Sequence, residues 1–126
     1  METGQAPLGA KMHSAGFVLK GELTNVRWRD FLYAVTEAIG MEPVGEPAYW
    51  KYPTGDGKGG EGQTMVLPIT ESFLALDTWS DHGGAYLFVC SCRPYHLQHI
   101  DTVAREFGLQ PAANGGARFY HELKLV

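Results

Sequence analysis

The chain has 126 residues, the size of one domain with its own hydrophobic core, and its 14 acidic and 10 basic residues give a net charge of −4. The basic residues are scattered, which argues against nucleic acid as the main partner because phosphates are bound by clustered lysines and arginines. No apolar run approaches the roughly 20 residues that span a bilayer, and residues 1–10 lack the pattern of a signal peptide, so we expect a flexible lead-in and a cytoplasmic protein.

The first elements expected are a strand and an amphipathic helix. Residues 12–20 form a short apolar run typical of a strand. Apolar residues then recur at helical spacing up to Ile39, with Thr24 or Asn25 as the cap. Gly40 is the expected left-handed stop of this helix.

A less regular region follows the helix. A second strand is expected within residues 42–52, irregular or at a sheet edge because two prolines interrupt it. Residues 53–62 are rich in glycine and polar side chains, which predicts a mobile loop. The loop contains a Gly-x-Gly-x-x-Gly spacing, but neither an apolar strand before it nor a helix after it supports a nucleotide-binding loop.

The second half of the chain predicts mostly strands. Residues 64–71 and 72–79 are expected as two consecutive strands or one long bent strand. A turn over residues 80–84 and an apolar strand over residues 85–91 follow.

The last elements expected are a second helix and a final strand. Pro94 suits the first turn of the helix, which carries an apolar face and stops at Gly108. A loop over residues 111–116 then leads into a strand over residues 118–126.

This order predicts an α+β two-layer sandwich, one domain over residues 1–126 in which two helices cover one face of an antiparallel sheet. The opposite sheet face also needs a cover, so we expect a homodimer or higher homo-oligomer with sites near its interface. The two cysteines lie in one Cys90-Ser91-Cys92 unit, where ring strain disfavours a disulfide and too few ligands gather for a metal.

The most informative segment opens at Glu71-Ser72. A decarboxylase of amino acids needs an electrophilic carbonyl that forms a Schiff base with the substrate amine, and no ordinary side chain provides one. If the Ser72 hydroxyl attacks the carbonyl carbon of Glu71, the amide becomes an ester, and elimination with loss of ammonia leaves a pyruvoyl group. This chemistry also needs an oxyanion donor and a base for the serine α-proton.

The segment from Thr64 to Cys92 resembles the bacterial S-adenosylmethionine decarboxylases, which are pyruvoyl-dependent and cut themselves at a Glu-Ser pair. That pair matches Glu71-Ser72, and a Thr-Trp pair matches Thr78-Trp79. The family's hydroxyl residue that assists processing falls on Thr64, and its thiol proton donor falls on Cys92.

The resemblance implies the family's sandwich fold and a pyruvoyl cofactor made from Ser72 by autocatalytic cleavage into residues 1–71 and 72–126. It also implies a lyase that decarboxylates S-adenosyl-L-methionine or a related basic amino acid, ornithine or arginine, in polyamine and spermidine biosynthesis.

The chain departs from the family pattern in its Gly-rich segment before Thr64, which is longer than the family's, and at three places after Ser72. Phe73 and Asp77 replace two histidines, the second of which is the family's processing base, and Ser80-Asp81 replaces Pro-Glu. An aspartate is a weaker base than histidine at neutral pH. Strand alternation also places Ser72 and Asp77 on opposite faces unless a bulge intervenes.

The same positions suggest how a substrate is bound. Asp77 could bind a substrate cation, either a sulfonium or the distal amine of ornithine or arginine. Tyr49, Trp50 and Tyr52 lie where the family has an aromatic platform for adenine, although core or interface packing explains them equally well. With Phe73 they are the candidate substrate-binding residues.

The remaining histidines give weaker indications. His96 and His99 have the spacing of a helical metal pair, but solvent-facing histidines are the more common case. His13 resembles a histidine on the family's first strand, or it is a satisfied core side chain. Two alternatives to the decarboxylase stay open. The first is a non-processed relative that binds or cleaves S-adenosylmethionine as a lyase or hydrolase, with Glu71 as a general base or substrate-positioning group. The second is a non-enzymatic ligand-binding domain.

Overall fold

A computed structural model of the chain describes residues 11–52, 62–79, 83–111 and 118–124. The expected lead-in, most of the glycine-rich loop, and parts of the turn at 80–84 and the loop at 111–116 lie outside these residues. No helix in the described part of the chain is long and apolar enough to cross a membrane.

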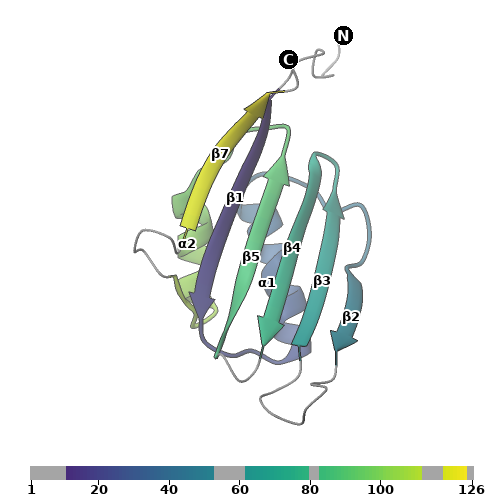
Figure 1. Ribbon diagram of the computed structural model, residues 1–126, viewed down its shortest axis with the longest axis vertical. Helices are drawn as coiled ribbons and strands as arrows, with labels where there is room; N and C mark the ends of the chain where they lie inside the picture. Colours follow the sequence, from purple (N-terminus) through teal and green to yellow (C-terminus); the bar gives the residue numbers. More distant parts are fainter. Residues whose placement is uncertain (1–10, 53–61, 80–82, 112–117, 125–126) are drawn as a thin grey trace.

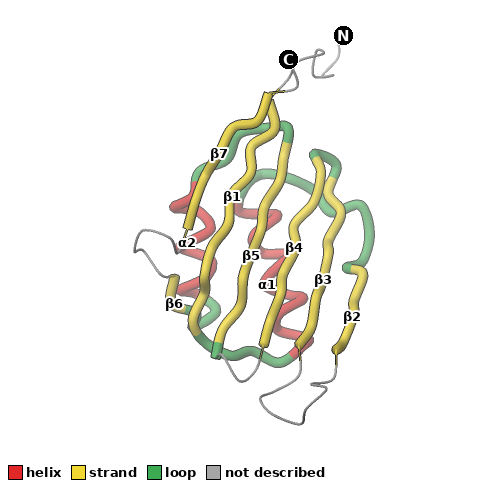
Figure 2. The backbone as a smooth tube through the Cα atoms, in the orientation of Figure 1, coloured by secondary structure: helices red, strands yellow, loops and turns green. Residues whose placement is uncertain are grey.

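Within the described residues, seven strands form one antiparallel sheet and two helices lie together behind it (Figure 1). The elements follow in this order: β1 (Lys11–Lys20), α1 (Asn25–Ala38), β2 (Ala48–Tyr52), β3 (Gly62–Ile69), β4 (Ser72–Trp79), β5 (Gly84–Ser91), α2 (Leu97–Glu106), β6 (Gln110–Pro111) and β7 (Arg118–Lys124). The sheet order is β2-β3-β4-β5-β1, and both β6 and β7 pair with β1 along its outer side (Figure 2). The predicted α+β sandwich is confirmed.

The ends of α1 follow the signals in the sequence. The Thr24 hydroxyl accepts a hydrogen bond from the Arg27 amide at 3.2 Å, which satisfies one of the free donors at the start of the helix. Gly40 follows the helix with a φ of 75°, a conformation that glycine adopts at little cost.

The second helix begins later than predicted. It starts at Leu97 with His96 as its cap, so Pro94 lies ahead of the helix and not in its first turn. The reason is Tyr95, which is buried and hydrogen-bonds the carbonyl oxygens of Val89 and His13. This anchoring keeps the chain extended until His96.

The core lies between the sheet and the helices. Alternate strand residues point toward α1 and α2 and are almost fully buried with the helix faces; the largest are Leu19, Phe31, Leu32, Leu67, Leu74, Leu76, Leu87 and Ile100. Burying an aliphatic or aromatic side chain contributes about 1.5–3 kcal/mol before entropy is counted. The helix-facing side of the sheet is therefore the side that holds the fold together.

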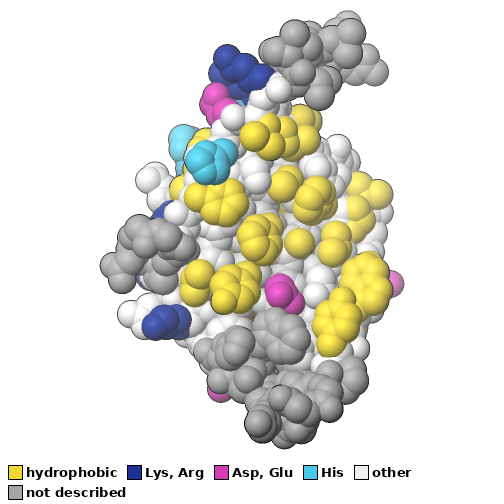
Figure 3. Space-filling model, in the orientation of Figure 1, with side chains coloured by type: hydrophobic (Ala, Val, Ile, Leu, Met, Phe, Trp, Pro, Cys, Tyr) yellow, Lys and Arg dark blue, Asp and Glu magenta, His cyan; other side chains and the backbone are white. Residues whose placement is uncertain are grey.

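The other alternate residues form the open face, the side of the sheet that no helix covers. Hydrophobic side chains spread across this face (Figure 3). They include Val18, Trp50, Tyr52, Val66, Phe73, Ala75, Tyr86, Phe88, Phe119 and Leu123. The ring of Phe119 lies directly over Gly16. A Cβ added to that glycine would come within 2.3 Å of the ring, so only glycine leaves room for it in this position.

Candidate active site

The Glu71-Ser72 bond lies at the tight turn between β3 and β4. Ile69 pairs with Ser72, so only Thr70 and Glu71 form the turn. Ser72 is also in register with the buried Ser91 of β5. The sequence left open whether this region is one bent strand or two, and the structure shows a two-residue hairpin.

Glu71 is held from both its backbone and its side chain. Its carbonyl oxygen accepts a hydrogen bond from the Cys92 amide at 3.1 Å. Its carboxylate accepts hydrogen bonds from Arg93 at 2.9 Å and from the Thr70 hydroxyl at 2.6 Å. The carbonyl of the Glu71-Ser72 peptide bond is thus fixed beside an N–H donor, the kind of group that stabilises a developing oxyanion.

A row of polar residues runs across the sheet from Ser72. Ser91 is opposite Ser72, His13 is opposite Ser91, and Glu122 is opposite His13. Ser91 is fully buried, and its hydroxyl accepts a hydrogen bond from the Arg93 amide at 2.9 Å. The row therefore connects β4, β5, β1 and β7 on the helix side of the sheet.

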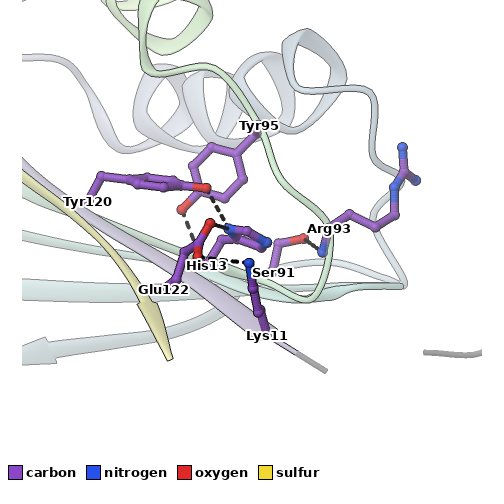
Figure 4. Close-up of polar contacts among 7 residues, drawn as sticks. All are labelled: Lys11, His13, Ser91, Arg93, Tyr95, Tyr120 and Glu122. Carbon is purple, nitrogen blue, oxygen red and sulfur yellow. Dashed lines mark hydrogen bonds and ion pairs between the residues drawn. The ribbon is translucent and has the colours of Figure 1, made fainter. Parts of the chain in front are cut away.

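The His13 ring lies between Tyr120 and Ser91 (Figure 4). Its Nδ1 is hydrogen-bonded to the Tyr120 hydroxyl and lies 3.9 Å from Glu122 Oε1. Lys11 Nζ lies 3.2 Å from the other oxygen of Glu122. His13 is a buried, hydrogen-bonded side chain, which agrees with the interpretation of this residue as a satisfied core side chain.

Two tyrosines enclose this region from the helix side. The Tyr95 hydroxyl donates to the Val89 carbonyl at 2.7 Å and lies 3.3 Å from the His13 carbonyl. Burial raises the pKa of Tyr95, with smaller contributions from Tyr120 and Cys90. Burial also raises the pKa of Tyr120, and the charge of Glu122 adds to the shift while Lys11 opposes it. Both phenols are therefore protonated at neutral pH.

Thr64 and Asp77 lie elsewhere on the sheet. They face each other across β3 and β4, and the Thr64 hydroxyl donates to Asp77 Oδ1 at 3.3 Å. The register of β4 is continuous, so Asp77 is five positions, about 16 Å, from Ser72 and on the open face, as alternation predicts. The structure does not bring Thr64 or Asp77 to the Glu71-Ser72 bond of the same chain, and their catalytic roles stay predictions.

The candidate substrate-binding aromatics divide between the two faces. Trp50 and Tyr52 lie on the open face, and Trp50 is opposite Thr64. Tyr49 points to the helix side, where its hydroxyl accepts a hydrogen bond from Asn25 at 3.1 Å. It lines a cavity of about 210 Å³ beside the start of α1. Phe73 is on the open face next to the hairpin turn, 39% exposed.

Neither the helical histidines nor the cysteines form a larger cluster. The rings of His96 and His99 are 5.4 Å apart, and both side chains are exposed. Among the described residues, no three of histidine, cysteine, aspartate and glutamate are placed to hold a metal ion. Cys90 and Cys92 are both free thiols, and the thiol of Cys90 contacts the Ser14 hydroxyl at 3.5 Å.

Sequence reasoning missed two residues beside the Glu71-Ser72 bond, Arg93, which contacts the Glu71 carboxylate, and Ser91, which is opposite Ser72. It also missed Tyr95, Tyr120 and Glu122, which surround His13 farther along the row. Of these residues, only Ser91 could have been found from the sequence, because it lies on the strand next to Ser72. Placing it opposite Ser72 still required the register of the two strands.

The structure is an α+β sandwich in which a Glu-Ser pair lies at a hairpin turn beside the Cys92 amide. The family model described as S-adenosylmethionine decarboxylase matches residues 24–112, which is more than half of the chain. The chain therefore belongs to the S-adenosylmethionine decarboxylase family, a family of decarboxylases known for a pyruvoyl cofactor. The comparison with curated proteins finds no match.

Proposed function

We propose that the chain cuts itself between Glu71 and Ser72 and becomes a pyruvoyl-dependent decarboxylase. The observation that supports this most directly is the hydrogen bond from the Cys92 amide to the Glu71 carbonyl oxygen. That oxygen gains negative charge when a hydroxyl attacks the carbonyl carbon. A donor that is already in position stabilises this charge without any reorganisation energy. Arg93 holds the side chain of the same residue.

The proposed cleavage proceeds in two stages. In the first, the Ser72 hydroxyl loses its proton and attacks the Glu71 carbonyl carbon, and the C–N bond then breaks as the nitrogen takes up a proton, which leaves an ester. In the second, a base removes the Ser72 α-proton and the Cβ–O bond breaks, so that residues 1–71 leave with a new carboxylate. One water then hydrolyses the remaining unsaturated residue, with release of ammonia, to the pyruvoyl group that begins residues 72–126.

The residues around the bond fit this cofactor. A pyruvoyl group supplies an electrophilic carbonyl that takes the substrate amine and accepts the electrons left by carbon dioxide. Cys92 is exposed and its amide already contacts the junction, which suits the family's thiol role of donating a proton to the product. Arg93 would neutralise part of the charge on the new Glu71 terminus.

The open face supports a substrate with a cationic group. Asp77 is opposite Tyr86 on one side and Thr64 on the other, and Trp50 is the next residue in the row. A carboxylate beside exposed aromatic rings suits a sulfonium or an ammonium group. We therefore propose S-adenosylmethionine, or ornithine or arginine, as the substrate. Asp77 lies about 16 Å from Ser72 of its own chain, so in this proposal it binds the cation of a substrate held at Ser72 of a second copy.

A second copy of the chain is the proposed cover of the open face. The exposed rings there include Tyr86 and Phe88, at 44% and 40% exposure, in the middle of the sheet. Contiguous apolar surface of this kind marks an association site. A homodimer would also place Thr64 and Asp77 at an interface, where they could face groups of the other chain. Sedimentation at several protein concentrations tests this, and a monomer throughout would contradict it.

Intact mass tests the proposed function. We expect two fragments, residues 1–71 and 72–126, the second with a blocked N-terminus, whereas Ser72→Ala stays as one full-length chain. The processed protein should release carbon dioxide from S-adenosylmethionine, ornithine or arginine labelled at the carboxyl carbon.

An uncut wild-type chain would refute the proposal. If that uncut chain consumed S-adenosylmethionine without releasing carbon dioxide, the non-processed lyase or hydrolase would be supported instead. If it showed only a thermal shift with ligand and no turnover, the non-enzymatic binding domain would be supported.

A further inference from the structure

We infer that Arg93 is a positioning residue for the cleavage between Glu71 and Ser72, a role that rests on the proposed self-cleavage. Two consecutive residues after β5 contact Glu71. The Cys92 amide donates to its carbonyl oxygen at 3.1 Å, and Arg93 Nη1 lies 2.9 Å from its carboxylate oxygen Oε2. The residue on the acyl side of the bond is therefore held at both its main chain and its side chain.

The carboxylate of Glu71 is well suited to fix the geometry of the turn. Its side chain is only 14% exposed, and both of its oxygens accept hydrogen bonds, Oε1 from the Thr70 hydroxyl at 2.6 Å and Oε2 from Arg93. A hydrogen bond between two charged groups is about twice as strong as one between neutral groups. Because Thr70 and Glu71 are the two residues of the hairpin turn, these contacts limit how far the Glu71 carbonyl can rotate.

The chain on either side of Arg93 is anchored. Its amide donates to the hydroxyl of Ser91 at 2.9 Å, and Ser91 is fully buried. Two residues later, Tyr95 is also buried and hydrogen-bonded. Pro94, which follows Arg93 directly, limits the backbone conformations open to it. In Figure 4 the Arg93 side chain extends away from the His13 ring, so the guanidinium reaches out from a fixed base.

This contact serves the acyl transfer in two respects. The Ser72 oxygen must reach the Glu71 carbonyl carbon in one orientation, and small displacements of reacting groups lower the rate strongly. The carbonyl oxygen also becomes negative during the attack, and an unpaired carboxylate on the same residue would oppose that charge. The Arg93 guanidinium neutralises this carboxylate. Arg93 exchanges no proton in this role, and it acts on the reacting carbonyl only through the Glu71 side chain.

The test is the rate at which newly made chain is cut, followed by intact mass after cell-free synthesis at one pH. Arg93→Ala should slow cleavage roughly ten-fold or more. Arg93→Lys keeps the charge and should recover part of the rate, whereas Arg93→Gln should not. Arg27→Ala is the matched control, because Arg27 is an exposed arginine that also lies 4.0 Å from a carboxylate, that of Asp30, and this variant should be cut like the wild type.

A double-mutant cycle separates positioning through Glu71 from a general structural effect. If Arg93 acts through the Glu71 carboxylate, adding Arg93→Ala to Glu71→Ala should change the rate by less than about two-fold. In the uncut Ser72→Ala protein, Arg93→Ala should leave the thermal midpoint nearly unchanged, because an ion pair with a solvent-exposed partner adds little to stability.

The outcomes separate this inference from the proposed function. A wild-type chain that stays intact refutes self-cleavage itself, and the role of Arg93 with it. If the wild type is cut and Arg93→Ala is cut equally fast, only the role of Arg93 is refuted. The same conclusion follows if Arg93→Ala slows cleavage as much in Glu71→Ala as in the wild type. If Glu71→Ala is cut too slowly to measure, equal rates for Arg93→Lys and Arg93→Gln refute the role instead.

Discussion

Replacing Tyr95 with phenylalanine removes one hydroxyl from the buried wall of the candidate site. That hydroxyl donates to the Val89 carbonyl at 2.7 Å and lies 3.3 Å from the His13 carbonyl. Because the residue is only 8% exposed, water replaces the lost donor poorly. We expect the free energy of unfolding to fall by about 1–3 kcal/mol at neutral pH, the cost of an unsatisfied buried group.

The same substitution should change how stability depends on pH. Burial raises the pKa of Tyr95, so above about pH 10 the unfolded chain loses this proton while the folded chain keeps it. The folded state then binds more protons, and stability falls as the pH rises past 10. The wild type has this loss of stability and Tyr95→Phe does not. The difference in unfolding free energy between the two proteins is therefore largest below pH 10 and becomes smaller above it.

The assay is urea unfolding between pH 7 and 11, at one protein concentration and in the Ser72→Ala background so that every protein is a single chain. Tyr86→Phe is the matched control, since that ring lies on the open face of β5 at 44% exposure, and we expect a change below about 0.5 kcal/mol. A gap between wild type and Tyr95→Phe that stays constant up to pH 11 would refute the buried-phenol reasoning.

Two further predictions concern the open face. Gly16→Ala places a Cβ 2.3 Å from the outer edge of the Phe119 ring. Because that ring is 39% exposed and can turn aside, the unfolding free energy in urea titrations should fall by less than about 1 kcal/mol, and adding Phe119→Ala should abolish the difference between glycine and alanine at position 16; a larger loss that persists without the ring would contradict this contact. Phe88→Glu puts a charge in the middle of the proposed dimer interface and should give a folded monomer by sedimentation, whereas Val26→Glu, at an exposed position on α1, should sediment like the wild type. A Phe88→Glu protein that remains dimeric would remove the open face as the interface.

Much of the fold follows from local patterns in the sequence. The apolar run of β1 and the helical spacing of α1 with its Thr24 cap and Gly40 stop predicted both elements within one or two residues. What local patterns did not predict depends on contacts distant in sequence. The two residues of β6 form a strand only because they pair with Leu19 and Lys20. Pro94 is excluded from α2 because Tyr95 is anchored under the sheet.

The candidate site could be predicted only in part for the same reason. Glu71, Ser72 and Cys92 could be predicted because they match the spacing of the family's motif, and the hairpin and the end of β5 bring them together. His13 and Ser91 are not linked to Ser72 by that spacing, and only the register of three strands aligns them. The division of the aromatic residues between the two faces could have been predicted from the sequence, because strand alternation alone places Tyr49 on the opposite face from Trp50 and Tyr52.

The positions that match the family and those that depart from it occupy different parts of the sheet. At the hairpin end, the hydrogen bonds of Glu71 within the described part of the chain are made with Cys92, Arg93 and Thr70, and not with Phe73 or Asp77. Both replacements point to the open face, where Asp77 pairs with Thr64. Exchanging an imidazole for a carboxylate there changes the charge and hydrogen bonding of that face and leaves the contact between the Cys92 amide and the Glu71 carbonyl oxygen in place. The replacements at Phe73 and Asp77 therefore alter the open face, whereas the hydrogen bonds that hold Glu71 come from the hairpin and the residues that follow β5.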